Sequence, residues 1–121
     1  MGDRLVAGAL GLVRSGIGVA FLAAPRPLVE LWVGKPAGRA AALTARSVGG
    51  RDLALGIGVL RSLGNDEALA GWLVAGAVAD ASDAFAILAD SRDLPAPRRV
   101  AFLASASAAT IVAVRVARRL R

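Results

Sequence analysis

Six ionisable side chains interrupt the apolar stretches of this 121-residue chain, and they are the side chains best placed to do chemistry. They are Arg14, Arg46, Arg51, Asp52, Asp80 and Asp83. Charged groups at membrane depth are costly, so they pair with one another, face a water-filled space or belong to a functional site. The segment RSVGGRD, residues 46–52, is the densest part of this set. The remaining segments must therefore bring compensating charges to it.

These residue types fit several roles. As structural ion pairs they would fix the register of neighbouring helices, because Arg and a carboxylate form two parallel charge-assisted hydrogen bonds. Alternatively, they would line a polar pocket that binds a lipophilic or amphiphilic ligand. If that pocket were an active site acting on a lipophilic substrate, Asp80 or Asp83 would be the catalytic acid or base, because two nearby carboxylates can share a proton. An accessory subunit of a membrane complex is a further alternative, and the sequence leaves all four open.

The composition indicates one integral membrane domain over residues 1–121. Hydrophobic residues make up 56% of the chain and charged residues 20%, and the mean hydropathy is +0.61, whereas soluble domains are less hydrophobic and more charged. Many apolar residues are small, which suits close packing of membrane helices. The chain has no Cys and no His. Thiol chemistry and the usual zinc and haem sites are therefore excluded, and we expect no metal and no cofactor.

The net charge of +6 does not indicate a nucleic-acid partner. Many of the basic residues lie in residues 92–99 and 115–121, where they are typical of anchors to lipid headgroups. A nucleic-acid surface needs a basic groove with interleaved aromatic residues, and this pattern is missing. We therefore expect membrane lipid, and not nucleic acid, around the protein.

Hydropathy predicts an all-α fold, an up-down bundle of four transmembrane helices. The predicted spans are residues 5–24, 40–63, 68–89 and 100–117. A bilayer core of about 30 Å requires about 20 residues of helix. Prolines at positions 25 and 27 end the first span, and LVELWV, residues 28–33, is predicted to be a short interfacial helix. The second span is the weakest, because each charge facing lipid at its centre would cost roughly 2.5–3.5 kcal/mol.

An antiparallel hairpin of the second and third spans predicts which charges meet. Matching residues at equal depth places Arg51 opposite Asp80. The same register places Arg46 within about one helical turn of Asp83. The other two members of the set fall at similar depth, so the sequence predicts a neutral layer of three positive and three negative charges.

Two further features concern association and orientation. Small residues recur every four positions in the fourth span, at Ala101, Ser105, Ala109, Ala113 and Ala117. This stripe is a packing face for the bundle itself or for another subunit, and we expect a homo-oligomer, most simply a dimer. Basic residues are balanced between the two sides of the membrane, but the dense tail at 115–121 favours cytoplasmic termini in a multi-pass protein of the cell membrane.

Three stretches carry a resemblance to a known family. They are AAPRPLVELWVG at 23–34, ARSVGGRDLALGIGVLR at 45–61 and AGAVADASDAF at 75–85. On these stretches the chain resembles a family of uncharacterised small four-helix membrane proteins common in actinobacteria. The resemblance covers nearly the whole chain, and GGRDLALGIG is its most specific part. It implies a four-helix fold and a membrane location, and it implies no activity.

Overall fold

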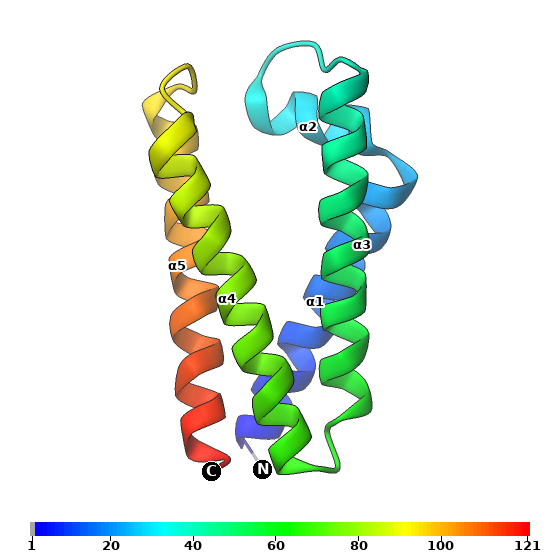
Figure 1. Ribbon diagram of the computed structural model, residues 1–121, viewed down its shortest axis with the longest axis vertical. Coiled ribbons are helices and arrows are strands. Elements are labelled where there is room, and N and C mark those ends of the chain that lie inside the picture. The colour runs from blue at the N-terminus through cyan, green and yellow to red at the C-terminus, as the bar shows by residue number, and fades with distance from the viewer. Residues whose placement is uncertain (1) are drawn as a thin grey trace.

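The computed structural model describes residues 2–121, and these residues fold into five α-helices. They are α1 (Gly2–Ala23), α2 (Pro25–Val33), α3 (Arg39–Arg61), α4 (Asp66–Asp90) and α5 (Ala96–Arg119). The long helices run alternately up and down, and both termini lie at the same end (Figure 1). The predicted all-α fold and the short helix after the first long helix are therefore confirmed.

The short helix α2 is longer than predicted, because its two prolines start it and do not precede it. Pro25 is its first residue, a position that proline favours because the missing N–H has no partner there and the fixed φ suits a helix. The helix ends at Gly34, whose φ of 78° is the left-handed conformation common after a helix C-terminus. The backbone N–H of Gly34 donates to the carbonyl oxygen of Glu30.

Three helices within residues 2–121 are long and apolar enough to cross a membrane, namely α1, α4 and α5. The predicted second span corresponds to α3, which has 23 residues but falls outside this group. Its internal charges, Arg46, Arg51 and Asp52, account for its lower hydropathy. Composition and length alone therefore support three spans, and the predicted span α3 is established as a helix.

The long helices associate as two antiparallel pairs, α1 with α3 and α4 with α5. Figure 1 shows the pairs close together at the end with the termini and divergent toward the end that carries α2. Although α3 and α4 follow each other in the chain, each packs mainly against its partner in the pair. The predicted hairpin of the second and third spans is therefore a loose one, and this changes which charges meet.

Glycines bring the backbones of α1 and α3 close together. A Cβ atom on Gly18 would lie 2.5 Å from the backbone nitrogen of Leu53. A Cβ atom on Gly49 would lie 2.8 Å from the carbonyl oxygen of Gly18, whereas Gly50 faces open space. A Cβ atom cannot approach backbone nitrogen or oxygen atoms so closely, so both positions need glycine. The close approach of the two backbones therefore involves Gly49 and not its neighbour Gly50.

The hydrophobic core lies between the two pairs at the end with the termini. Its buried residues are Ala7, Val59, Leu69, Ala70, Leu73, Ala77, Ala113, Val116 and Ala117. Trp72 of α4 packs against α3, because a Cβ atom on Gly58 would collide with its indole ring. The lower part of the predicted small-residue stripe therefore packs inside the chain itself, since Ala113 and Ala117 belong to this core.

Candidate functional site

The central feature of the structure is a network of ion pairs that joins α1, α3 and α4. Arg14 of α1 contacts two carboxylates from different helices. Its Nη1 donates to Oδ1 of Asp52 on α3 at 3.1 Å, and its Nη2 donates to Oδ2 of Asp80 on α4 at 2.5 Å. The exposed fraction of these side chains is only 12–15%. The Arg14 guanidinium therefore ties the first helix pair to the second in a largely buried place.

Arg51 of α3 makes the second connection between the helix pairs. Its Nη1 and Nη2 donate to Oδ1 and Oδ2 of Asp83 at 2.8 and 2.7 Å, a bidentate pair. Its Nε and Nη2 also donate to Oδ1 of Asp52 at 3.3 and 3.2 Å. Asp52 consequently links the two arginines into one network, which we call the Arg/Asp network: Arg14, Arg51, Asp52, Asp80 and Asp83.

The predicted pairs were wrong, although the predicted depth was nearly right. Arg51 contacts Asp83 and not Asp80, a shift of three residues, which is less than one helical turn. Asp80 instead forms an ion pair with Arg14, because α1 packs on α3 and thereby places its arginine next to α4. Arg46 forms no ion pair or hydrogen bond with Asp83 within residues 2–121. Its Nε donates at 3.4 Å to the carbonyl oxygen of Leu22, near the end of α1.

Without Arg46, the charges of the network do not cancel. Two arginines face three aspartates, so the formal charge is −1 where the sequence predicted zero. Within residues 2–121, neither Oδ2 of Asp52 nor Oδ1 of Asp80 accepts a hydrogen bond. Both side chains are only 12% exposed. An uncompensated charge in such a place is costly, so the network favours either a further positive group or a proton on one of the carboxylates.

A cavity of about 520 Å³ opens directly onto the Arg/Asp network, between the two diverging helix pairs. Binding sites for small molecules have volumes of about 300–1,000 Å³. Every network residue except Arg51 lines it. The apolar wall comes from all five helices and includes Ile17, Phe21, Val29, Trp32, Val48, Ile87 and Phe102. The cavity therefore has a charged floor and apolar walls.

Aromatic residues and one arginine join α2 to α5 at the wide end of the cavity. The ring of Trp32 lies edge-on to Phe102, with centroids 4.6 Å apart, and to Phe21 at 6.5 Å. Nη1 of Arg98 donates to the carbonyl oxygens of Leu31 and Trp32, the latter at 2.8 Å. These contacts hold α2 over this end. The sequence did not single out Arg98 or Phe102, although both lie on one face at the start of α5.

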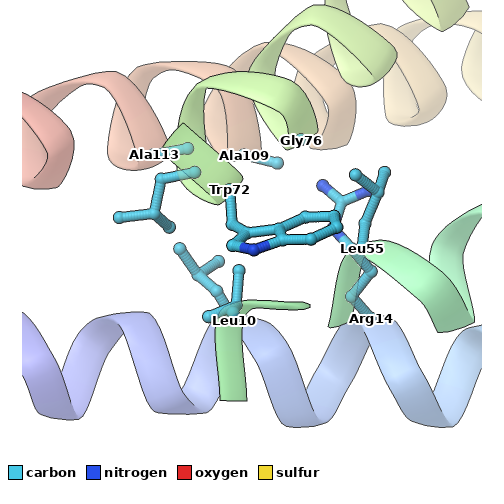
Figure 2. A pocket seen from close by; sticks show the side chains of 9 residues that line it. Leu10, Arg14, Leu55, Trp72, Gly76, Ala109 and Ala113 are labelled. Carbon is cyan, nitrogen blue, oxygen red and sulfur yellow. The ribbon is translucent and has the colours of Figure 1, made fainter. Parts of the chain in front are cut away.

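Trp72 lies on the side of the Arg/Asp network that faces the hydrophobic core, opposite the large cavity. Figure 2 shows its indole between Leu10 and Arg14 of α1 on one side and Ala109 and Ala113 of α5 on the other. The pocket there has a volume of only about 20 Å³, room for about one water molecule. Arg14 lines both spaces. Trp72 therefore fills the narrow end of the space between the helix pairs.

The two candidate catalytic residues differ in how fully they are engaged. Both oxygens of Asp83 accept hydrogen bonds from Arg51, whereas Asp80 keeps Oδ1 unpaired within residues 2–121.

Within residues 2–121, the structure holds no group of three His, Cys, Asp or Glu residues placed to bind a metal ion. No protein family, curated protein or solved structure matches the chain, so the resemblance to four-helix actinobacterial membrane proteins stays a prediction.

Proposed function

We propose that this protein spans the membrane four times and binds a lipophilic or amphiphilic ligand in the cavity between its helix pairs. The observation that carries the proposal is the 520 Å³ cavity itself, with apolar walls and the Arg/Asp network as its floor. The apolar walls suit a hydrocarbon chain or ring system. The charged floor suits one polar group, which is the usual division of labour in a ligand pocket.

The Arg/Asp network also supports α3 as the fourth span. Arg51 and Asp52 are both engaged in the network. The same helix also packs against α1 through Gly49, so it does not stand alone in lipid. Arg46 lies toward the end of α3 that is near α2, where a long side chain reaches the headgroup region. The cost of these charges is thus reduced by pairing and position.

Ion pairing alone is a weaker account of this arrangement. Buried ion pairs are often no more stabilising than apolar residues of the same volume. Two matched pairs would also fix the register without a third aspartate. A helix bundle held only by ion pairs has no need of a large cavity beside them. An acid-base enzyme is less well supported than binding, because Asp83 has both oxygens engaged by Arg51 and Asp80 is already paired with Arg14 through one oxygen.

The proposal extends to location and association. We place the protein in the cell membrane with both termini on the cytoplasmic side, on the strength of the basic tail at 115–121. We also propose a homo-oligomer, most simply a dimer. Its interface cannot use the whole small-residue stripe of α5, since Ala113 and Ala117 are buried and Ala109 lines the cavity. Exposed apolar residues on the outer faces of the helices, such as Leu12 and Leu43, remain available.

The test is native mass spectrometry of the protein released directly from membranes. Ala109 lines the cavity, so Ala109→Phe should fill it, whereas Ala108→Phe places the same ring on an exposed position of α5 outside the lining. We expect the wild-type protein and Ala108→Phe to retain a small lipophilic species that Ala109→Phe has lost. Equal retention by all three proteins, or a folded wild-type protein with no bound species, would contradict the proposal. A retained partner chain would instead support an accessory subunit.

A further inference from the structure

We propose that the polar group of the ligand is a cation, in chemical class a protonated aliphatic amine, held between Asp52 and Asp80. This inference rests on the proposed binding function and adds the charge of the ligand. Its starting point is the −1 charge of the Arg/Asp network. A singly charged cation at the floor of the cavity makes the buried layer neutral.

Two residues that line the cavity each keep one carboxylate oxygen without a hydrogen-bond partner within residues 2–121. Asp52 and Asp80 both line the cavity and both contact Arg14 through one oxygen. The other oxygen of each, Oδ2 of Asp52 and Oδ1 of Asp80, accepts no hydrogen bond within residues 2–121. A primary ammonium group carries three N–H donors and no acceptor, so it can donate to both oxygens at once.

An anionic group fits the floor poorly. It would meet three aspartates, and both terminal nitrogens of Arg14 are already directed at carboxylates. Arg51 does not line the cavity, and both terminal nitrogens of its guanidinium group donate hydrogen bonds to Asp83. The remaining cation in the lining, Arg98, lies at the far end beyond Phe102. An anionic head placed there would direct its hydrocarbon tail onto buried charges.

The apolar walls of the cavity determine the chemistry of the rest of the ligand. The cationic group would lie on the floor, and a hydrocarbon tail would run past Ile17 and Ile87 toward Trp32 and Phe102. This orientation buries the tail among apolar side chains. It also brings the tail into contact with Trp32, while Trp72 lines the separate small pocket on the other side of Arg14. The two tryptophans of the chain therefore act as reporter and internal control.

The experiment uses a bromoalkyl primary amine and the bromoalkyl carboxylic acid of the same chain length, added to the protein in lipid nanodiscs. Bromine quenches tryptophan fluorescence on contact. Trp72→Phe leaves Trp32 as the reporter, and Trp32→Phe leaves Trp72 to measure simple partition into the lipid. We expect the amine to quench Trp32 saturably, with an apparent affinity roughly ten- to a hundred-fold above that of the acid.

Two substitutions test where the amine binds. In the Trp72→Phe background, Asp80→Asn and Asp52→Asn should each weaken binding of the amine roughly ten-fold or more, and neither should weaken binding of the acid. Circular dichroism shows whether each variant is folded, and two positions are used so that one folded variant suffices. If neither substitution affects the amine, the cation is not held at these carboxylates and the inference is overturned.

The outcomes separate this inference from the proposed function. If the acid quenches Trp32 saturably and as strongly as the amine or more strongly, the proposed cationic ligand is contradicted. The proposed binding of lipophilic molecules in the cavity would still hold. That result would mean that a proton on one of the aspartates already balances the network. If neither probe quenches Trp32 more than Trp72, the cavity does not bind lipophilic molecules and both proposals fall.

Discussion

Neutralising Asp80 should cost the protein far less stability than neutralising Arg14, although the two are partners in one ion pair. Arg14→Gln leaves one positive and three negative charges in the Arg/Asp network, and it removes the only ion-pair partner that Asp80 has within residues 2–121. The side chains involved are only 12–15% exposed, so water relieves little of this cost. Breaking a buried pair in this way costs about 3–5 kcal/mol.

Asp80→Asn has the opposite effect on the charge balance. It leaves two positive and two negative charges, so the network becomes neutral. The amide oxygen of Asn still accepts a hydrogen bond from Arg14, so the loss is the difference between a charged and a neutral acceptor, about 1 kcal/mol. The two substitutions should therefore differ by about 2 kcal/mol or more.

The assay is reversible unfolding in mild detergent by titration with a denaturing detergent, followed by far-ultraviolet circular dichroism. Arg46→Gln is the matched control, because Arg46 lies on α3 but forms no ion pair with a carboxylate of residues 2–121. We expect it to change the free energy of unfolding by no more than about 0.5 kcal/mol. The reasoning is refuted if Asp80→Asn destabilises the protein as much as Arg14→Gln, or if Arg46→Gln matches Arg14→Gln.

The same titration tests the second connection of the network. Arg51→Leu and Asp83→Leu should each destabilise the protein, and the double variant should recover part of the loss, with a coupling of about 1–3 kcal/mol; additive effects would argue against the bidentate pair. Gly18→Ala should cost about 1–3 kcal/mol because its Cβ would meet α3, while Gly16→Ala, which has open space, should be neutral or stabilising by up to about 1 kcal/mol. Equal effects at the two glycines would show that α1 and α3 do not approach closely. Arg98→Gln should loosen α2 and raise hydrogen exchange of its amides, and unchanged exchange would contradict the tether to α5.

Much of the helical fold was predictable because its signals are local. Proline and glycine at residues 25–38 separate α1 from α3, and Gly64 and Asn65 mark the turn before α4. Asn65 caps α4 by accepting a hydrogen bond from the backbone N–H of Ala68, as its residue type favours. The length and hydropathy of the apolar runs do the rest, so each predicted span lies on one of the long helices.

The partners within the charged layer were not predictable, because they depend on how the helices pair. Matching depths in one hairpin gave the position of Arg51 to within one turn but could not show that Arg14 of another helix would take Asp80. That outcome follows from the packing of Gly18 against Gly49, which places α1 beside α3. Small residues on each helix were visible in the sequence, but which small residues face each other was not.

A pocket at the charged residues was one of several alternatives at the level of the sequence, but its walls were not predictable, for a similar reason. The cavity arises because the two helix pairs diverge above the Arg/Asp network, and divergence is a property of the whole arrangement. Residues such as Phe102 and Arg98 acquire their roles only when α2 folds over them. The charge imbalance also appeared only in three dimensions, once Arg46 was found to bind the end of α1 instead of an aspartate.

The most direct test of a lipophilic binding site between the helix pairs is photolabelling in native membranes with an alkyl diazirine, followed by peptide mapping. We predict that labelling of the cavity residues Ile17, Ile87 and Phe102 saturates and is lost in Ala109→Phe. Labelling of the exposed residues Leu88 and Ile111 should rise in proportion to the probe and be unaffected by that substitution. Cavity residues that are never labelled, or that are labelled in the same unsaturable way as Leu88, would contradict the account.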